Sequence, residues 1–393
     1  MTILLLVIIY IAFIGLGLPD SLIGSAWPGI YPEFGLPNTY ISFITFTISG
    51  CTVLSSMFSD KIINKLGTGK VAAFSTALTA LAILGFSFSE QFIFLVLLAI
   101  PLGLGAGAID SSLNNYIALH YTARHMNYLH CFYGIGVSCS PYLMSMALSN
   151  TSWRDGYKYA FIVQIVITLI LVLSLPLWKK NGGNEDGEDV KPVSLSFIDA
   201  MKRPEIRMVL LIMLATNAIE YACGTWGSTF LVEARNFDPD SAAILLTLYY
   251  AGMALGRFTS GVLENVIKTW LRIAIGVCIV FVAVILMLVP NGVFFSAAGL
   301  FLIGFGNGSI YPNLIYLTPY NFGKEVSQSI MGFQIAAAYT GVMLTPPLFG
   351  LVSSLLGIKV YPIFLVVLWV LMAVSILVFV KKMKSLGRFD KNV

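Results

Sequence analysis

Three acidic residues stand in stretches of sequence that are otherwise apolar. Sixteen of the nineteen acids can be assigned to loops or to the ends of apolar segments, which leaves Asp20, Asp110 and Glu220. Burial disfavours the charged form of a carboxyl group, so an acid in such a place can take up and release a proton near neutral pH. A carboxylate beside amide oxygens can also hold a hard cation such as sodium. The alternative is a structural carboxylate that bonds hydroxyls or amides of a neighbouring helix.

Each of these acids shares a helical face with small or polar residues. On a helix of 3.6 residues per turn, Asn114 lies one turn after Asp110, and Asn217 lies about one turn before Glu220. A charge at the centre of a membrane helix costs about 2.5–3.5 kcal/mol, so three such acids indicate a water-filled functional cavity. We predict that Asp110 is the main protonation site, with Asn114 binding a solute beside it. Asp20 is its partner or a second proton carrier.

Polar side chains that can read the hydroxyl groups of a solute occur in the same apolar stretches. They offer amides, phenols, an imidazole and an indole for hydrogen bonding, and their rings offer flat apolar surface. An unbonded amide in an apolar interior is costly, which favours a function for Asn307, Asn313 and Gln334. Packing is the alternative for each candidate, and His130 can also relay protons or bond a neighbouring group. The candidates are Tyr116, His130, Tyr133, Gln164, Asn217, Tyr221, Trp226, Asn307, Tyr311, Asn313 and Gln334.

The sequence lacks the patterns of enzymes and of ATP-driven pumps. No nucleophile elbow, Walker loop or HExxH is present, and the three histidines lie within eleven residues, so a catalytic metal site is not indicated. The five cysteines show no CxxC spacing and are predicted to be small packing residues, without disulfide or zinc. We therefore expect no enzyme activity, no cofactor and no nucleic-acid partner.

The composition indicates which elements must position these residues. The chain has 393 residues, of which 58% are hydrophobic and 11% charged, and its mean hydropathy is +0.86. A soluble protein is about one quarter charged, so this is predicted to be a polytopic membrane protein. A membrane helix takes roughly 20 apolar residues, and the first is predicted to be retained, not a cleaved leader. We predict twelve spans near residues 3–31, 38–58, 70–88, 92–120, 127–149, 157–178, 205–232, 239–263, 271–289, 293–318, 325–353 and 359–380.

The distribution of basic residues predicts the orientation in the membrane. If the N-terminus is inside the cell, nineteen of the twenty-three Lys and Arg residues lie on the cytoplasmic side, among them Arg257 and Arg272. Both termini are therefore predicted to be cytoplasmic, in a multi-pass protein of the cell membrane.

A polar linker and an internal repeat predict two halves. The segment KKNGGNEDGEDVKP (179–192) is too polar to bury and divides the spans six and six. GLGAGAIDSSL (103–113) aligns with GFGNGSIYPNL (304–314) at an offset of 201, and a similar offset pairs Asp20 with Glu220. We expect an all-α protein with a six-helix bundle over residues 1–178, a linker over 179–204, a second bundle over 205–380 and a tail over 381–393. Such paired halves with a site near the midplane are typical of secondary transporters.

The loop between the second and third spans resembles the cytoplasmic motif of the major facilitator superfamily. In FSDKIINKLGTGK (58–70), Asp60, Lys61, Gly67 and Lys70 fill the places of its acid, basic residues and glycine, and GRFTSGVLE (256–264) resembles the counterpart in the second half. The resemblance implies rocking of two halves around a central site. It also implies a conformational latch formed by Asp60, Lys61 and Gly67, with Arg124 as the candidate partner of Asp60. A solvated charge cluster is the alternative.

Within that superfamily, several segments resemble the fucose:proton symporter group. These are Pro19-Asp20, GAIDSSLNN (107–115), HCFYGIG (130–136) and NAIEYACGTWGSTFL (217–231). The fourth-span acid is Asp110, where the fucose symporter has Glu. The resemblance implies that the solute is a sugar.

Together these patterns predict a proton-coupled importer of a sugar or another small polar solute, sufficient as a monomer in the lipid bilayer. Proton-driven export of amphipathic compounds and sodium-coupled symport remain open, because the same acids can serve both. A membrane sensor or scaffold that does not transport is a fourth possibility, and it predicts binding without flux.

Overall fold

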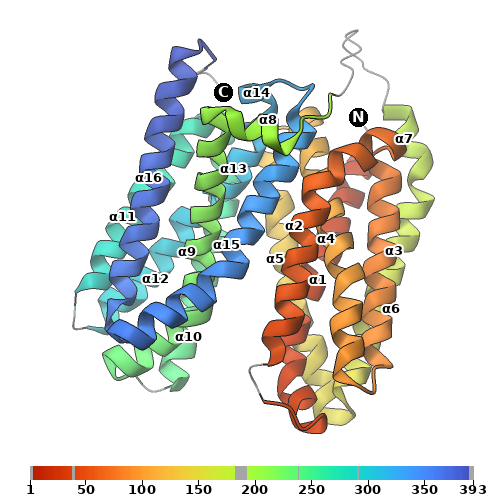
Figure 1. Ribbon diagram of the computed structural model, residues 1–393, viewed down its shortest axis with the longest axis vertical. Helices are drawn as coiled ribbons and strands as arrows, with labels where there is room; N and C mark the ends of the chain where they lie inside the picture. Colours follow the sequence, from red (N-terminus) through yellow and green to blue (C-terminus); the bar gives the residue numbers. More distant parts are fainter. Residues whose placement is uncertain (1–2, 38–39, 182–192, 238, 290–291, 389–393) are drawn as a thin grey trace. The chain divides into compact units, whose positions relative to one another are not determined.

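The chain forms two compact helical units. The computed structural model describes residues 3–37, 40–181, 193–237, 239–289 and 292–388, and all regular structure in these ranges is helical (Figure 1). Unit 1 consists of Met1–Tyr116, Leu129–Ser194 and Lys324–Ala336. Unit 2 consists of Ile117–Tyr128, Leu195–Gly323 and Ala337–Val393. Residues 182–192 of the predicted linker (179–204) and residues 389–393 of the predicted tail lie outside the described residues.

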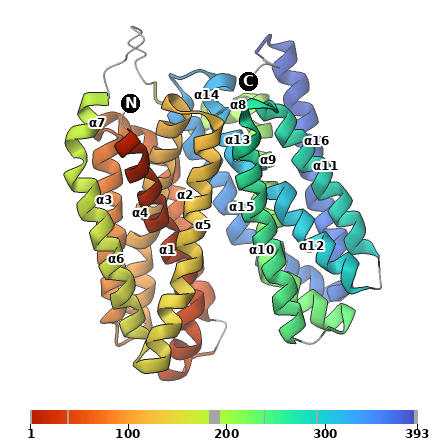
Figure 2. The ribbon, with the colours of Figure 1, turned by 180° about the vertical axis from the view of Figure 1, so that it is seen from behind.

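Unit 1 is built mainly from the first seven helices, drawn from red to yellow-green in Figure 2. Its core lies among α1, α3, α4 and α6, where Trp27, Phe86 and Trp153 are almost fully buried. The helices are α1 (Ile3–Glu33), α2 (Ile41–Leu66), α3 (Thr68–Ser87), α4 (Phe92–His120), α5 (Ala123–Asn150), α6 (Trp153–Leu173) and α7 (Leu175–Asn181).

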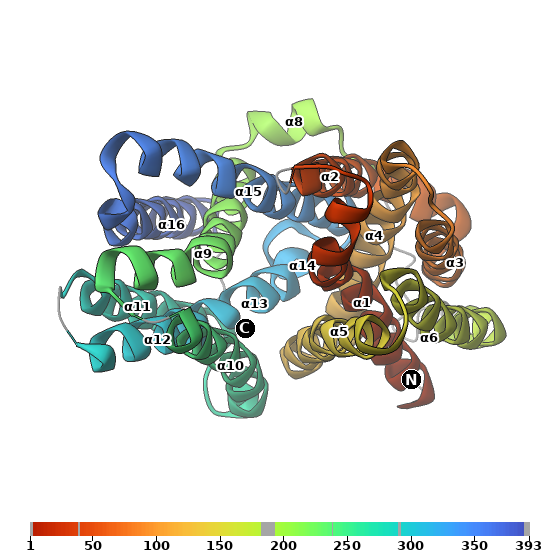
Figure 3. The same ribbon diagram turned by 90° about the horizontal axis from the view of Figure 1, so that it is seen from below.

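Unit 2 is built mainly from the later helices. The view along the helices in Figure 3 shows α9 beside α16 and α11 beside α12, the pairs that pack closely. The elements are α8 (Phe197–Lys202), α9 (Pro204–Arg235), α10 (Pro239–Val262), α11 (Thr269–Leu288), α12 (Val293–Gly308), α13 (Ile310–Tyr316), α14 (Thr318–Phe322), α15 (Ser327–Leu356) and α16 (Tyr361–Ser385), with 3-10 turns at Leu263–Asn265 and Ile358–Val360.

The predicted membrane spans correspond to long helices. Eleven helices in the described part of the chain are long and apolar enough to cross a membrane. The predicted eighth span forms α10, a helix of 24 residues that is not among those eleven. The all-helical membrane fold is therefore confirmed, with eleven or twelve crossings.

Two predicted spans are interrupted at prolines. The tenth divides into α12 and α13 at Ser309, and the sixth divides into α6 and α7 at Ser174. Pro312 and Pro176 each follow the break within a few residues. Proline has no N–H to bond the carbonyl four residues earlier, and its ring crowds that carbonyl. Hydropathy does not register this effect, so the sequence predicted continuous helices.

The repeated glycines perform the same packing role in both units. A Cβ atom on Gly103 would collide with the backbone carbonyl of Ile48, and one on Gly304 would collide with that of Tyr249. The glycines are 201 positions apart, and so are the carbonyls that they face. In each unit the fourth helix of the half thus approaches the second at backbone distance, as small residues permit in membrane proteins. The repeat found in the sequence therefore has a physical counterpart.

Each unit includes a segment from the other half of the sequence. The connection between α4 and α5 belongs to unit 2, and the first turns of α15 belong to unit 1. The backbone N–H of Val193, just after the linker, donates to the carbonyl of Glu325 over 2.9 Å. The boundary of the units is therefore not a single cut at the linker.

Four positions differ from their predicted surroundings. Arg257 and Arg272, counted among the cytoplasmic charges, have exposed fractions of only 7% and 4% and lie inside or at the start of long helices. Cys139 and Cys278, expected to pack in the interior, are exposed. Charge counting and hydropathy give the depth of a residue along a helix, but not the direction in which its side chain points.

Candidate functional site

Asp110 lies in the interior of unit 1, on α4. Its side chain is buried, and its Oδ1 accepts a hydrogen bond of 2.6 Å from Nδ2 of Asn114. The same amide nitrogen donates to the backbone carbonyl of Asp110 over 2.9 Å. The predicted one-turn spacing therefore brings these two side chains into direct contact.

His130 extends this contact to α5. Both partners of Asn114 Nδ2 are oxygens that only accept, so the amide oxygen of Asn114 must face the other way. That oxygen lies 3.2 Å from Nε2 of His130. The Nε2 atom of His130 therefore carries a hydrogen and donates it. The ring is also held edge-on against Phe13, with centroids 5.5 Å apart, and His130 is buried.

Asp20 lies on α1 of the same unit. Its Oδ2 accepts a short hydrogen bond from the hydroxyl of Tyr133, one turn after His130 on α5. A further bond of 2.6 Å from Ser21 Oγ to the carbonyl of Val137 fixes α1 against α5. Asp20 also interacts electrostatically with Asp110. Three helices of one unit thus hold both acids, and α5 supplies a polar partner to each network.

Glu220 has a different environment in unit 2. Its Oε2 lies 3.9 Å from Nη2 of Arg257 on α10. The side chain of Glu220 keeps 22% of its surface exposed and that of Arg257 keeps 9%. The hydroxyl of Tyr249 contacts the backbone carbonyl of Glu220 at 3.5 Å, not its carboxylate. The two pseudo-equivalent acids, Asp20 and Glu220, therefore face a phenol in one case and a guanidinium in the other.

The predicted solute-binding amides are engaged by the protein. Asn307 donates to the carbonyl of Thr216 over 2.9 Å. Asn313 donates to Ser260 Oγ over 2.8 Å and accepts from Asn127 over 3.1 Å. Asn307, Asn313 and Gln334 have exposed fractions of 2% or less. A solute can reach them only after a change of conformation, and their role in binding stays a prediction.

The remaining candidates divide between packing and partly exposed positions. Trp226 donates its indole N–H to the carbonyl of Pro346 over 3.1 Å, which leaves only the ring for a solute. Asn217 donates to the carbonyl of Met213 over 2.9 Å and is half-buried. Gln164 is almost fully buried and donates to Thr79 over 2.8 Å. Tyr221 and Tyr311 are half-buried, whereas Tyr116 is buried beside Trp178.

Asp60 is the centre of a polar cluster in unit 1. It is buried, and its Oδ1 accepts the backbone N–H of Lys61 over 2.7 Å. Its Oδ2 accepts the hydroxyl of Ser329 over 2.6 Å and that of Ser194, just after the linker. Asp60 thus joins α2 to the first turns of α15 and to the linker end. Its predicted role as a latch is not tested by these contacts.

Asp60 belongs to unit 1 and Arg124 to unit 2, so their predicted pairing stays a prediction. The Nε atom of Arg124 lies 3.6 Å from Oε2 of Glu264 in unit 2, and Thr122 donates to the same oxygen over 2.9 Å. Glu264 ends the motif that resembles the loop of Asp60, so each motif acid has partners of its own. A local motif shows that an acid is present, but its side-chain partners are more than one hundred residues away along the chain.

Gly67 makes the tight turn between α2 and α3. Its φ angle is +82°, a region that side chains rarely adopt, and its N–H donates to the carbonyl of Ile63 over 2.7 Å. The glycine of the motif therefore has a backbone role, and it sets the direction in which the chain leaves Asp60 and Lys61.

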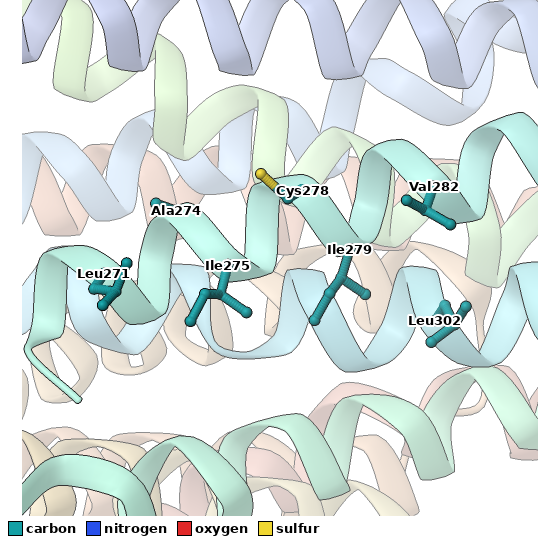
Figure 4. Close-up of a pocket in the computed structure, with 7 residues that line it drawn as sticks. All are labelled: Leu271, Ala274, Ile275, Cys278, Ile279, Val282 and Leu302. Atoms are coloured by element: carbon teal, nitrogen blue, oxygen red, sulfur yellow. The ribbon is translucent and has the colours of Figure 1, made fainter. Parts of the chain in front are cut away.

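An apolar groove lies on α11 and α12 (Figure 4). Its volume of about 480 Å³ would hold a small sugar. Only carbon atoms and the sulfur of Cys278 line it, so it offers no strong hydrogen-bonding group to a polar solute. The polar candidates lie elsewhere. No cluster of His, Cys, Asp or Glu that could hold a metal ion occurs among the described residues.

Several polar residues of these networks were missed from the sequence. Arg257 is the clearest case, because it lies inside the predicted eighth span and a single Arg in an apolar segment is itself a signal. Ser194, Ser329 and Asn127 carry no such signal, since serine and asparagine are common in loops and helix ends.

Comparison with known proteins gives one consistent result. The profile of the Major Facilitator Superfamily matches residues 9–339 and, in a second match, 230–391. Bypass of stop codon protein 6 of Saccharomyces cerevisiae is 21% identical, over 92% of this chain and 79% of the yeast protein. The crystal structure of FucP, the E. coli fucose:proton symporter, in its outward conformation superposes with a TM-score of 0.75 at 16% identity, over 95% of this chain and 98% of FucP. The human organic anion transporter MFSD10 gives 0.72 at 13% identity, over 96% and 99%. The likeness to the solved structures concerns the fold.

Proposed function

The chain belongs to the major facilitator superfamily and is a secondary transporter, and we propose that it moves a sugar or a similar small hydroxylated solute together with protons. The observation that carries the proposal is the pair of carboxyl networks in unit 1. Asp110 is held by Asn114 and His130, and Asp20 by Tyr133. All of these partners are polar side chains of one unit inside membrane helices.

Neutral partners suit an acid that exchanges protons. The amide of Asn114 and the phenol of Tyr133 can bond either form of a carboxyl group, so neither fixes the charge of its acid. Two negative charges at this depth repel each other and are poorly solvated, so binding of a proton stabilises the pair. Asp110 is the proton carrier and Asp20 its partner. His130 holds the amide of Asn114 in the orientation that Asp110 requires.

The relatives support the proposal only in part. FucP is named as a fucose:proton symporter, whereas MFSD10 is named as an organic anion transporter. A shared fold at 13–16% identity is compatible with either class of solute. The preference for a neutral sugar rests on the motif resemblance and on the polar side chains described above.

We assign control of the conformational cycle to Asp60 and Glu264, the acids of the two loop motifs. Asp60 with Ser194 and Ser329, and Glu264 with Thr122 and Arg124, form clusters that must break and re-form as the protein alternates between its states. The protein works as a monomer in the cell membrane, with both termini cytoplasmic, and needs no cofactor.

Exchange and accumulation in proteoliposomes test the proposal. The purified chain is assayed for counterflow of radiolabelled L-fucose, D-galactose, D-glucose and D-mannose, at two pH values, with and without sodium. Saturable exchange together with net uptake that follows an imposed proton gradient is expected. Accumulation that follows sodium would replace the proton by sodium. Exchange of cationic or amphipathic compounds in place of sugars would place the protein among exporters, and binding without any flux would indicate a sensor.

Asp110→Asn separates coupling from binding. The variant is expected to exchange solute at equal concentrations on both sides but to lose accumulation against a gradient. Glu33→Gln is a matched control, because Glu33 is an acid of the same unit but lies at the end of α1, where it bonds Arg154. Full proton-driven accumulation by Asp110→Asn would show that the proton is carried elsewhere.

A further inference from the structure

Glu220 differs from the other two intramembrane acids in its hydrogen bonding. Asp110 accepts from Asn114, and Asp20 accepts from Tyr133. Within the described part of the chain, no side chain or backbone group donates a hydrogen bond to the carboxylate of Glu220, whose interaction is the 3.9 Å ion pair. The side chain of Glu220 keeps 22% of its surface exposed. Glu220 therefore has acceptor capacity that the fold does not use.

The distance to Arg257 leaves room between the two charges. A direct hydrogen bond between a guanidinium and a carboxylate is about 2.7–2.9 Å long. Arg154 and Glu33 in unit 1 are in direct contact at 2.6 Å, whereas Glu220 and Arg257 are 3.9 Å apart. A strong acceptor and a strong donor thus stand side by side without a direct bond between them.

We propose that Glu220 and Arg257 bind two adjacent hydroxyl groups of the solute. One hydroxyl donates to the carboxylate of Glu220, and its neighbour accepts from the guanidinium of Arg257. Neighbouring hydroxyls of a sugar present a donor and an acceptor at about the spacing of one hydrogen bond. This inference rests on the proposed function, and it assigns solute recognition, not proton coupling, to Glu220.

The charge of the pair selects a neutral solute. Glu220 and Arg257 compensate each other, so a neutral diol leaves the net charge of the site at zero. An anionic solute at Arg257 would add an uncompensated negative charge among membrane helices, which is costly. The geometry therefore favours neutral polyols over sugar acids. Asn217, about one turn before Glu220 and half-buried, is a predicted solute ligand on the same helical face.

A purely structural ion pair is the competing explanation, and a double neutral variant distinguishes the two. Single neutralisation leaves one charge uncompensated, and that can prevent folding. Glu220→Gln combined with Arg257→Gln avoids this problem and keeps the side chains at similar size. The matched control is Glu33→Gln with Arg154→Gln, which removes an ion pair from the end of a helix.

The experiment measures half-saturating concentrations in proteoliposome counterflow. The probes are L-fucose, D-galactose, D-glucose and D-mannose, singly deoxygenated derivatives of the preferred sugar, and its uronate. In the wild type, removal of either of two adjacent hydroxyls is expected to weaken binding about 10- to 100-fold, as for a hydrogen bond to a charged group. The double neutral variant is expected to bind the parent sugar about 10- to 100-fold more weakly than the wild type does. It is also expected to bind the parent sugar and the deoxygenated sugars equally well. The control variant, Glu33→Gln with Arg154→Gln, is expected to keep the wild-type affinity and the discrimination between the sugars.

Each other result overturns the inference in a recognisable way. Wild-type affinity and discrimination in the double variant would leave proton-coupled sugar transport intact and reduce the pair to packing. Preference for the uronate, lost in Arg257→Gln, would replace the neutral diol by an anion. Wild-type protein that exchanges no neutral sugar would overturn this inference and the proposed solute together. If the double variant does not fold, Arg257→Lys, which keeps the charge but not the planar fork, must still lose discrimination.

Discussion

The two units share a backbone frame but differ in the polar residues that it carries. Gly103 and Gly304 bring equivalent helices together in the same way, 201 residues apart. Within this common frame, unit 1 surrounds its acids with an amide, an imidazole and a phenol, whereas unit 2 places Arg257 beside Glu220. An internal repeat therefore conserves the packing that builds the bundle and leaves side chains free to specialise.

The two proposals assign different tasks to the two units. Neutral hydrogen-bond partners leave a carboxyl group able to change its charge, which suits proton binding. A neighbouring guanidinium supplies a fixed counter-charge and additional donors, which suits recognition of hydroxyls. Five experiments can break or sharpen this comparison.

The largest effect is expected when the buried acids of the two units are neutralised in separate variants. Asp110→Asn should abolish accumulation driven by a proton gradient, because the amide cannot carry a proton between the two sides. Glu220→Gln combined with Arg257→Gln should retain accumulation at saturating solute, because the proton site in unit 1 is intact. Uptake ratios in proteoliposomes measure both. Loss of coupling in the second variant would show that the units do not divide the work.

Alanine at the paired glycines should destabilise both units alike. In Gly103→Ala and Gly304→Ala, the added methyl group would meet the backbone carbonyls of Ile48 and Tyr249. Overpacking of this kind costs about 1–3 kcal/mol, so the melting temperature of the purified protein should fall in both variants. Gly50→Ala is the control, because nothing lies within 4 Å of its added Cβ. A large drop in melting temperature in only one of the two glycine variants would show that the two units are not packed equally tightly at these positions.

Neutralising Asp60 should reduce the transport rate more than neutralising Glu264. Asp60→Asn weakens buried hydrogen bonds from two hydroxyls and should reduce the transport rate about tenfold or more, since bonds to a charged group contribute about 1.5–3 kcal/mol each. Glu264→Gln removes a more exposed ion pair with Arg124, worth about 0.2–1 kcal/mol, and should reduce the rate about two- to fivefold.

A charge exchange distinguishes the partners of these acids. Glu264→Arg with Arg124→Glu should restore the rate that either single change loses, because the two side chains are 3.6 Å apart. Asp60→Arg with Arg124→Glu should not restore it. Rescue by the second pair would instead support the predicted latch between Asp60 and Arg124.

The smallest effect is expected at the end of α1. Burial opposes ionisation of Glu33, but hydrogen bonds from Trp153 and Arg154 and the charge of Arg154 prevail and hold its pKa below the ordinary 4.5. A lowered pKa in the folded state stabilises the protein above pH 4.5, and this contribution disappears as the pH falls through the folded value. Glu33→Gln should therefore melt slightly lower than the wild type at pH 7, and the two melting temperatures should converge as the pH falls through the folded pKa of Glu33, which lies below 4.5. A constant difference across this range would exclude the ion pair as its cause.

Much of the fold and part of the site could be predicted from the sequence. The fourth span was predicted at 92–120, and α4 runs over the same residues. The contact between Asp110 and Asn114 followed from their spacing along one helix. The partners that come from other helices could not be predicted, because Ser329 and Asp60 are 269 residues apart. Arg257 was predicted to be one of the cytoplasmic charges, but its side chain is buried beside Glu220. Its position along α10 does not reveal this direction.

The sequence by itself determined the membrane helices, their repeat and the presence of three acids among them. A helix in lipid must satisfy its backbone hydrogen bonds within one apolar segment, so its signal is local in the chain. Tertiary structure alone decided which neighbour each acid received. Tyr133 and Arg257 reach Asp20 and Glu220 from other helices, and that choice depends on how the helices pack against one another.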